Sequence, residues 1–175
     1  MFHHVGNAAA QRDDPGRQSR GDGGELRIRC KQQLFLNRTH VAQDALRGGA
    51  TITGNAGRNA GNVTITGGSF ASGTGAITAS GGAGLGTNQA GGNGGAVSVT
   101  TTGALTTAAI TASSGNATGT GTGGAAGSIT LSGGDLTVGN INTTGGSRGS
   151  GGGVAVTSTG TQALAAITAS AGTGG

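Results

Sequence analysis

The feature that most limits how this chain can fold is an imperfect repeat that runs from Gly49 to Gly175. A pair of aliphatic residues, separated by one small residue, recurs with spacings of 34, 32 and 25 residues. Each pair is followed by a lone bulky apolar residue and then by an isoleucine that opens a second short anchor. Every unit therefore carries three short segments with the character of strands. The aliphatic pairs are Val63 and Ile65, Val97 and Val99, Ile129 and Leu131, and Val154 and Val156.

Apolar and small hydroxyl side chains alternate within these segments, as they do from Asn62 to Thr66 and from Ala96 to Thr100. Because successive side chains of a strand point to opposite faces, this alternation predicts one buried apolar face and one outer face of Thr and Ser. We therefore predict that the apolar members form the structural core. These are Val63, Ile65, Phe70, Ile77, Val97, Val99, Leu105, Ile110, Ile129, Leu131, Leu136, Ile141, Val154, Val156, Leu164 and Ile167.

A single unit is too small to fold by itself. About five inward apolar side chains contribute about 7 to 15 kcal/mol of hydrophobic stabilisation, whereas ordering about 15 strand residues costs about 15 to 30 kcal/mol of backbone entropy. Stacking each unit on the next adds ladder hydrogen bonds and covers both sides of every inward side chain. The expected fold class is all-β, a right-handed parallel β-helix (solenoid) of about four to five coils, because the aliphatic residues do not keep the strict six-residue period of the left-handed form.

Glycine supplies 42 residues, and large side chains are scarce, with three Phe and no Trp or Tyr. Collagen is excluded, because the glycines are irregularly spaced and the chain has a single proline, Pro15. Tracts of Gly, Ala, Ser, Thr and Asn, such as residues 81–95, separate the strand segments and vary in length. We interpret them as loops on one edge of the solenoid and their glycines as turn residues.

Charge divides the chain into two parts, residues 1–48 and residues 49–175. Of the 16 charged residues only Arg58, Asp135 and Arg148 follow Arg47, so the repeat array is nearly neutral and offers no basic footprint for nucleic acid. One Asp cannot supply the paired carboxylates of glycoside hydrolysis or a calcium ligand in every repeat, and we interpret Asp135 as a turn residue. The sequence thus predicts a protein that is not an enzyme, with no catalytic residue, metal site or cofactor.

Residues 1–48 are basic, mixed in composition and without a repeat, and three interpretations stay open for them. In the first, Leu26, Ile28 and Cys30 alternate in a strand that is followed by a helix ending near Arg47, and the segment covers the end of the solenoid. In the second, it is a disordered leader. In the third, it is a non-native translation upstream of the repeats, as the abrupt change in composition at Gly48 indicates.

The unit from Gly91 to Ser113 resembles the repeats of filamentous-haemagglutinin-like exoproteins and autotransporter passengers of bacteria. The resemblance covers about residues 49–175 and rests on the style of the repeat. It implies a protein that is secreted or displayed at the bacterial outer membrane as a β-helical stalk, and that acts in adhesion. The export signal of that family is not recognisable here, so we expect an internal fragment, truncated at the C-terminus, with flanking repeats in a longer chain.

The sequence leaves several functions open, of which a non-catalytic structural or adhesive stalk segment is the first. Its partners would be host or surface glycans and proteins, and no stretch has the roughly 20 apolar residues of a membrane span. Arg20, Gly21 and Asp22 spell a tripeptide of the integrin-recognition type and are the candidate binding residues. An ice-binding or lattice-matching Thr-rich surface is one alternative, prompted by Thr51 and Thr53 and by Thr64 and Thr66. The row decays along the repeats, because the corresponding positions are Ser98 and Thr100, then Ser128 and Thr130, then Ala155 and Thr157. A disordered Gly/Ala-rich surface tract is the other.

Overall fold

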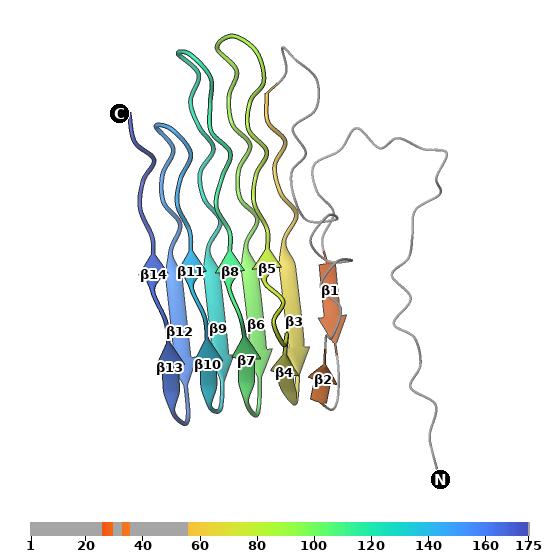
Figure 1. Cartoon of the computed structure of the whole chain (residues 1–175). Coiled ribbons are helices and arrows are strands. Elements are labelled where there is room, and N and C mark those ends of the chain that lie inside the picture. The colour runs from red at the N-terminus through yellow and green to blue at the C-terminus, as the bar shows by residue number, and fades with distance from the viewer. Residues whose placement is uncertain (1–25, 30–32, 36–55, 175) are drawn as a thin grey trace, which may run out of the picture.

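The computed structural model describes the backbone of residues 26–29 and 33–35 and all of residues 56–174. The described residues are all-β, with no helix among them, and their strands form three parallel sheets (Figure 1). Strands of one sheet come from successive repeats, so that each repeat adds one strand to each sheet. The predicted all-β class is confirmed for the described residues. The order of the strands is compatible with a solenoid whose coils stack side by side.

The three sheets have the following strands. The first has the order β1 (Leu26–Arg29), β3 (Val63–Gly67), β6 (Val97–Thr101), β9 (Ile129–Gly133) and β12 (Val154–Ser158). The second has the order β2 (Gln33–Phe35), β4 (Ser69–Ala71), β7 (Leu105–Thr107), β10 (Leu136–Val138) and β13 (Gln162–Leu164). The third has the order β5 (Ile77–Thr78), β8 (Ile110–Thr111), β11 (Ile141–Asn142) and β14 (Ile167–Thr168).

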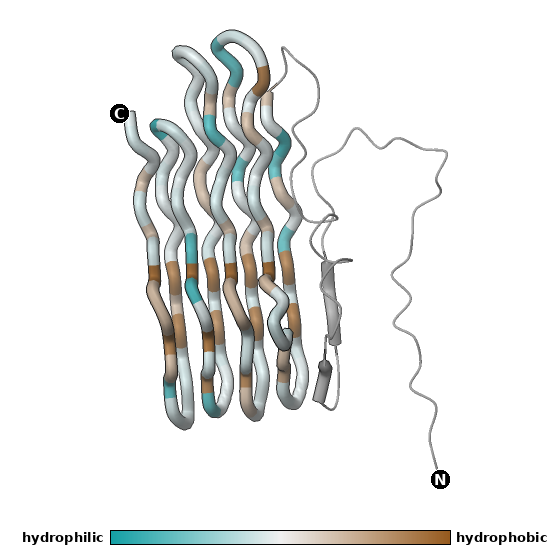
Figure 2. Tube along the Cα trace, in the orientation of Figure 1, coloured by the Kyte–Doolittle hydropathy of each residue, from teal (hydrophilic) through white to brown (hydrophobic). Residues whose placement is uncertain are grey.

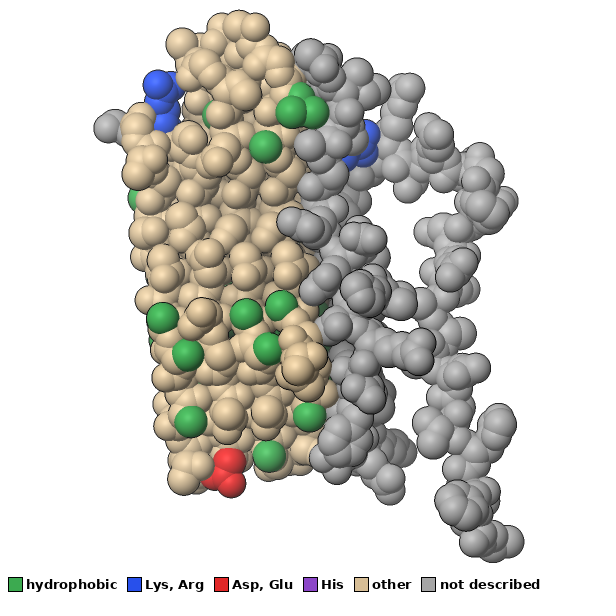
Figure 3. All heavy atoms as spheres, in the orientation of Figure 1, with side chains coloured by type: hydrophobic (Ala, Val, Ile, Leu, Met, Phe, Trp, Pro, Cys, Tyr) green, Lys and Arg blue, Asp and Glu red, His purple; other side chains and the backbone are tan. Residues whose placement is uncertain are grey.

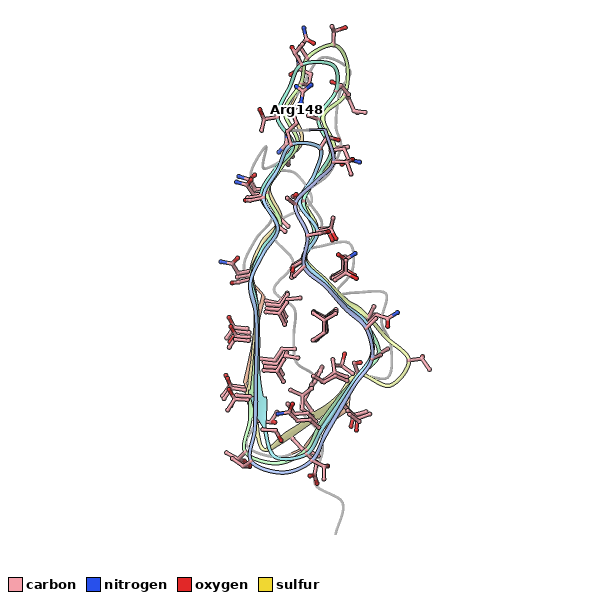
Figure 4. All side chains as sticks on the ribbon, turned by 90° about the vertical axis from the view of Figure 1, so that its left-hand side faces the viewer. Arg148 is labelled. Atoms are coloured by element: carbon pink, nitrogen blue, oxygen red, sulfur yellow. The ribbon has the colours of Figure 1, made fainter. Side chains whose placement is uncertain are left out.

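The register of the sheets places equivalent aliphatic residues in columns. Val63 pairs with Val97, Val97 with Ile129, and Ile129 with Val154. Seen down the stack in Figure 4, side chains of successive coils superpose, and Figure 2 shows the apolar segments gathered in the strand region. The core lies between the three sheets, within the strand region. Its buried hydrophobic members are Val63, Ile65, Phe70, Ala79, Val97, Val99, Leu105, Ile110, Ala112, Ile129, Leu131, Leu136, Val138 and Ile141.

The last described coil departs from the predicted core. Val154, Val156 and Leu164 are only partly buried against the cluster, as is Ile77 of the third sheet. Ile167 is 47% exposed, although it pairs with Ile141, which is 1% exposed. The prediction that Ile167 is a core residue is therefore wrong for this chain, because no described strand lies beyond β14 to cover it.

The tracts between the third sheet and the next first-sheet strand are ordered arms, which rise together above the strand region (Figure 1). Within one arm, backbone N–H groups donate to the same arm of the next coil at three-residue steps. Gly57 donates to the carbonyl of Ala90 at 2.8 Å, and Ala60 donates to that of Asn93 at 2.9 Å. A step of three residues is the period of a polyproline II-type segment, in contrast to the two-residue period of the strands.

Rising and descending arms are joined by a second series of backbone hydrogen bonds that runs through the stack. The N–H of Gly92 donates to the carbonyl of Gly82 at 2.8 Å, Gly115 to Gly92 at 2.9 Å, and Gly124 to Gly115 at 3.1 Å. Gly146 continues the series to Gly124 at 3.2 Å. The rising arms form one wall and the descending arms form the other, and each of these bonds crosses between the two walls. The backbones of the two walls are therefore held at the distance of a peptide hydrogen bond.

Close contacts between backbones, both from coil to coil within one wall and between the two walls, explain the glycine content of the arms. A Cβ atom on Gly92 would lie 2.0 Å from the carbonyl oxygen of Arg58 in the preceding coil of the same wall, and one on Gly81 would lie 2.1 Å from that of Gly92 in the opposite wall. Among the described glycines only Gly73, Gly86, Gly119 and Gly174 have a positive φ. The interpretation of the glycines as turn residues is therefore wrong for the arms, where glycine is needed because two backbones meet.

The pairing of coils extends into the segment that precedes the repeats. β1 pairs in parallel with β3, so that residues 26 and 28 lie in register with Val63 and Ile65. β2 pairs with β4 in the second sheet. The predicted strand that begins at Leu26 is thus present, whereas the predicted helix ending near Arg47 falls outside the described residues. The three interpretations of residues 1–48 stay hypotheses.

The arms give a direct test in two glycine substitutions. We expect Gly92→Ala to lower the free energy of unfolding by about 1 to 3 kcal/mol or more, because the methyl group meets a backbone carbonyl that cannot move aside. Gly153→Ala is the matched control, since nothing lies within 4 Å of a Cβ atom there, and it should change stability by less than about 0.5 kcal/mol. Urea unfolding followed by circular dichroism measures both, and equal stability of the two variants would contradict the arm packing.

Candidate functional surface

The outer side of the first sheet carries the most regular array of polar side chains in the described residues. We call it the hydroxyl face and define it by the outward positions of β3, β6, β9 and β12. Because side chains alternate along a strand, residues that flank the inward aliphatics point outward and form straight rows across the coils. The rows are Thr64, Ser98, Thr130 and Ala155, and Thr66, Thr100, Ser132 and Thr157.

The second of these rows carries a hydroxyl group in every coil from β3 to β12. Thr66, Thr100 and Thr157 are exposed and Ser132 is half-buried. Neighbouring members are about 4.8 Å apart across the strands, and the two rows are about 6.7 Å apart along them. The sequence predicts Ser128 and Thr130 at the outward positions of the third coil, whereas the register places Thr130 and Ser132 there. The row that begins at Thr64 still ends at Ala155, so the predicted decay is present in that row.

Asparagine side chains continue the coil-to-coil contacts beside the hydroxyl face. The Oδ1 atom of Asn59 accepts the N–H of Asn93 at 2.7 Å, and Oδ1 of Asn93 accepts the N–H of Ala125 at 2.9 Å. Asn62 does the same for the N–H of Ala96 at 2.8 Å. These amides satisfy arm N–H groups that point away from both the neighbouring coil and the opposite wall. Sequence analysis did not assign this role to the asparagines, although their spacing matches that of the repeat.

The arm apices are tied together by one arginine and one asparagine with left-handed backbones. Arg148, labelled in Figure 4, has a φ of 62°, and Asn88 has a φ of 55°. The guanidinium of Arg148 donates through Nε to the carbonyl of Gly174 at 2.7 Å and through Nη1 to that of Thr120 at 3.1 Å. Oδ1 of Asn88 accepts the N–H of Thr120 at 2.9 Å. The charge of Arg148 is therefore directed at backbone carbonyls of adjacent coils.

Asp135 lies in the bend between β9 and β10, as its interpretation as a turn residue requires. Its Oδ1 atom accepts two hydrogen bonds from Thr161 of the next coil, one from the N–H and one from Oγ1, both at 2.8 Å. The backbone hydrogen bond, followed by that of the hydroxyl, lowers the pKa of Asp135 below its ordinary value. The carboxylate thus acts as a cap on the following coil.

Acidic, histidine and cysteine side chains are not clustered in the part of the chain that the structure describes. No cluster of three or more His, Cys, Asp or Glu residues occurs among them. In the face shown in Figure 3, the acidic side chain lies at the strand end and the basic ones lie toward the arms. The candidate tripeptide of Arg20, Gly21 and Asp22 falls outside the described part of the chain. The hydroxyl face is therefore the candidate functional surface that the structure presents.

Comparison of the chain with protein-family models, with curated proteins and with solved structures finds no match. Residues 26–29, 33–35 and 56–174 include no helix long and apolar enough to cross a membrane.

The contact of Asp135 predicts a small dependence of stability on pH. Because the pKa of Asp135 is lowered in the folded state, the contact stabilises fully above the ordinary pKa of the carboxyl and is lost as the pH falls through the lowered folded value. We expect the wild type to lose stability over this acid range. Asp135→Asn keeps an acceptor oxygen and should lose less. Thermal unfolding of both proteins at neutral pH and about two units below the ordinary carboxyl pKa measures the difference, and parallel pH profiles would contradict the assignment.

Proposed function

We propose that residues 56–174 form a non-catalytic stalk segment of a secreted or surface-displayed bacterial exoprotein, wound as a right-handed parallel β-helix. The observation that carries the proposal is the in-register stacking of three parallel strands per repeat over successive coils. Such a stack lengthens by adding coils and gives an extended body. This is the form expected of a spacer or display element.

Connection rules support the right-handed winding. Each strand of the first sheet is joined to the next strand of that sheet by a crossover through the other two sheets and the arms. Connections between parallel strands of one sheet are right-handed in about 98% of cases. A coil that visits the three sheets in constant order, with apolar side chains facing a common interior, supports closure into a helix.

The distribution of polar groups supports a structural role over catalysis. Asp135 supplies the one carboxyl side chain of residues 56–174, and it is engaged by Thr161 of the next coil. A hydrolase of glycosides needs two carboxyl groups across one bond. The neutral outer surface of Thr, Ser and Asn suits weak, repeated contacts with glycans or other surfaces, whose combined strength grows with the number of coils.

The resemblance of the repeats to filamentous-haemagglutinin-like proteins supports the surface location and the adhesive role. It rests on the style of the sequence repeat, that is, on its aliphatic anchors and glycine tracts.

Protease resistance and cell binding test the proposal on the whole chain. We expect circular dichroism of the β type and slow cleavage within residues 56–174, because regular hydrogen bonding keeps the backbone closed to proteases. Beads coated with the chain should bind cells or glycan surfaces more than beads coated with Gly92→Ala. Rapid cleavage throughout the repeats with no β signal would favour the disordered surface tract, and a folded chain whose beads do not bind would leave the stalk without the adhesive role.

We propose a second candidate function, binding to ice or another regular lattice, because the row from Thr66 to Thr157 keeps a hydroxyl in every coil. Straight rows with fixed spacing can match a periodic surface, and the face carries no charged side chain on β3, β6, β9 or β12. Methyl and hydroxyl groups of Thr together suit a surface of ordered water.

Thermal hysteresis tests this second function. We expect measurable hysteresis from the wild type and its loss in Thr100→Lys, because a long charged side chain in the centre of the face separates it from a flat lattice. Thr106→Lys is the matched control, since Thr106 is an exposed threonine of the second sheet, and it should retain the activity. Absence of hysteresis in the wild type, or equal loss in both variants, would exclude the hydroxyl face as an ice-binding surface.

A further inference from the structure

Three asparagines beside the hydroxyl face have side chains whose orientation is fixed by the next coil. We call Asn59, Asn62 and Asn93 the amide corner. The Oδ1 atom of each accepts a backbone N–H one coil away, at 2.7 to 2.9 Å. A side-chain amide accepts only through its oxygen, so each Nδ2 group must point away from that contact. None of the three Nδ2 groups donates a hydrogen bond within the described part of the chain.

The amide corner lies on the outside of the molecule and adjoins the hydroxyl face. Asn62 and Asn93 are exposed and Asn59 is half-buried. Asn62 directly precedes the inward Val63, so it belongs to the same outward series as Thr64. Asn59 and Asn93 occupy equivalent positions of neighbouring coils, about 4.8 Å apart. Asn59 and Asn62 are three residues apart on one arm, which is about 9 Å in a polyproline II-type segment.

The chemistry of the corner is that of donors without acceptors. Each Oδ1 atom is already used by a backbone N–H, whereas each Nδ2 group offers two hydrogen atoms to a partner. A partner must therefore supply acceptor oxygens. Ordered water and simple hydroxyl groups donate as often as they accept, so they match this corner less well than a carbonyl oxygen does.

The charge of the surroundings favours a neutral acceptor. Strands β3, β6, β9 and β12 carry no charged side chain, so a carboxylate bound there would lose water without gaining a cation. Arg58, next to Asn59 in the sequence, does not alter this. A Cβ atom at its equivalent, Gly92, points along the stack to the preceding coil and not outward.

We propose that the amide corner and the adjoining hydroxyl rows bind a neutral, extended polysaccharide whose sugars carry acetamido groups. The inference rests on the adhesive role proposed above and names the ligand class and the residues for it. The acetamido carbonyl accepts from Nδ2, in a bond of the same kind as those that join the coils. Sugar hydroxyls pair with Thr and Ser, which both donate and accept. A polymer repeats these groups along its length, as the coils do.

The contacts of Oδ1 also lower the cost of binding. A side chain that is already held in one orientation loses less conformational entropy when a ligand engages it. Asn116 has the same kind of contact on the other wall, where its Oδ1 atom accepts the N–H of Ser147 at 3.1 Å. The two walls lie on opposite sides of the coil (Figure 4), so Asn116 is an exposed asparagine away from the hydroxyl face.

Binding of the full chain to chitin beads and to cellulose beads tests the inference, because the two polymers differ in the acetamido group. We expect retention on chitin and weaker retention on cellulose. Asn93→Asp keeps an acceptor for the N–H of Ala125 but removes both Nδ2 donors, and should weaken binding to chitin by about 2- to 10-fold. Asn62→Asp combined with Asn93→Asp should weaken it by more than about tenfold.

Asn116→Asp is the matched control, because it makes the same change of charge and keeps the same contact on the other wall. It should bind chitin as the wild type does, and circular dichroism checks that all variants keep the fold. Equal binding to the two polymers, or equal weakening by Asn93→Asp and Asn116→Asp, would overturn the inference. A wild type that binds cells or other glycans but not chitin would overturn it and leave the adhesive role standing. A wild type that binds none of these surfaces would remove both.

Discussion

Everything in this structure depends on hydrogen bonding from one coil to the next in constant register. The strands of each sheet pair with their equivalents one repeat away, and the arms do the same at three-residue steps. A single repeat has too few large side chains to repay the entropy of ordering its backbone. The main chain therefore supplies the specificity of stacking. Side chains need only fit a narrow interior and avoid clashes with the backbones of the walls.

The size of the inward side chain sets how far apart the walls of a coil stand. Phe70 and Leu105 fill the wide end, Ile110 follows, and Ala112 occupies the point at which the walls converge. Beyond it, Gly115 allows the walls to meet through peptide hydrogen bonds. The coil thus changes from a strand region with a side-chain core to arms with none, and the change from Ile through Ala to Gly along the sequence produces that taper.

The strand region could be predicted from the sequence. Aliphatic residues with a two-residue period, such as Val97 and Val99, indicate a strand and also identify its buried face. The arms could not be predicted, since glycine leaves no side-chain pattern and is equally typical of turns. Their three-residue period becomes visible only once the N–H groups of Gly92 and Gly95 are known to face the opposite wall. The third coil of the hydroxyl face was misaligned because Ser128, Thr130 and Ser132 are chemically alike, so that only the backbone register separates them.

The requirements of stacking also limit which positions are available for function. Buried inward positions are apolar or, at Ser72, Thr101, Thr107 and Thr143, carry a small hydroxyl side chain. Arm positions where a Cβ atom would meet a neighbouring backbone are glycine, and several asparagines accept hydrogen bonds from N–H groups of the next coil. Asp135 and Arg148 are used in the same way, to join neighbouring coils. The outward rows of the sheets are the positions that stacking leaves free to vary. A ligand preference encoded in this array must therefore be repeated from coil to coil, and its strength must depend on how many coils present it.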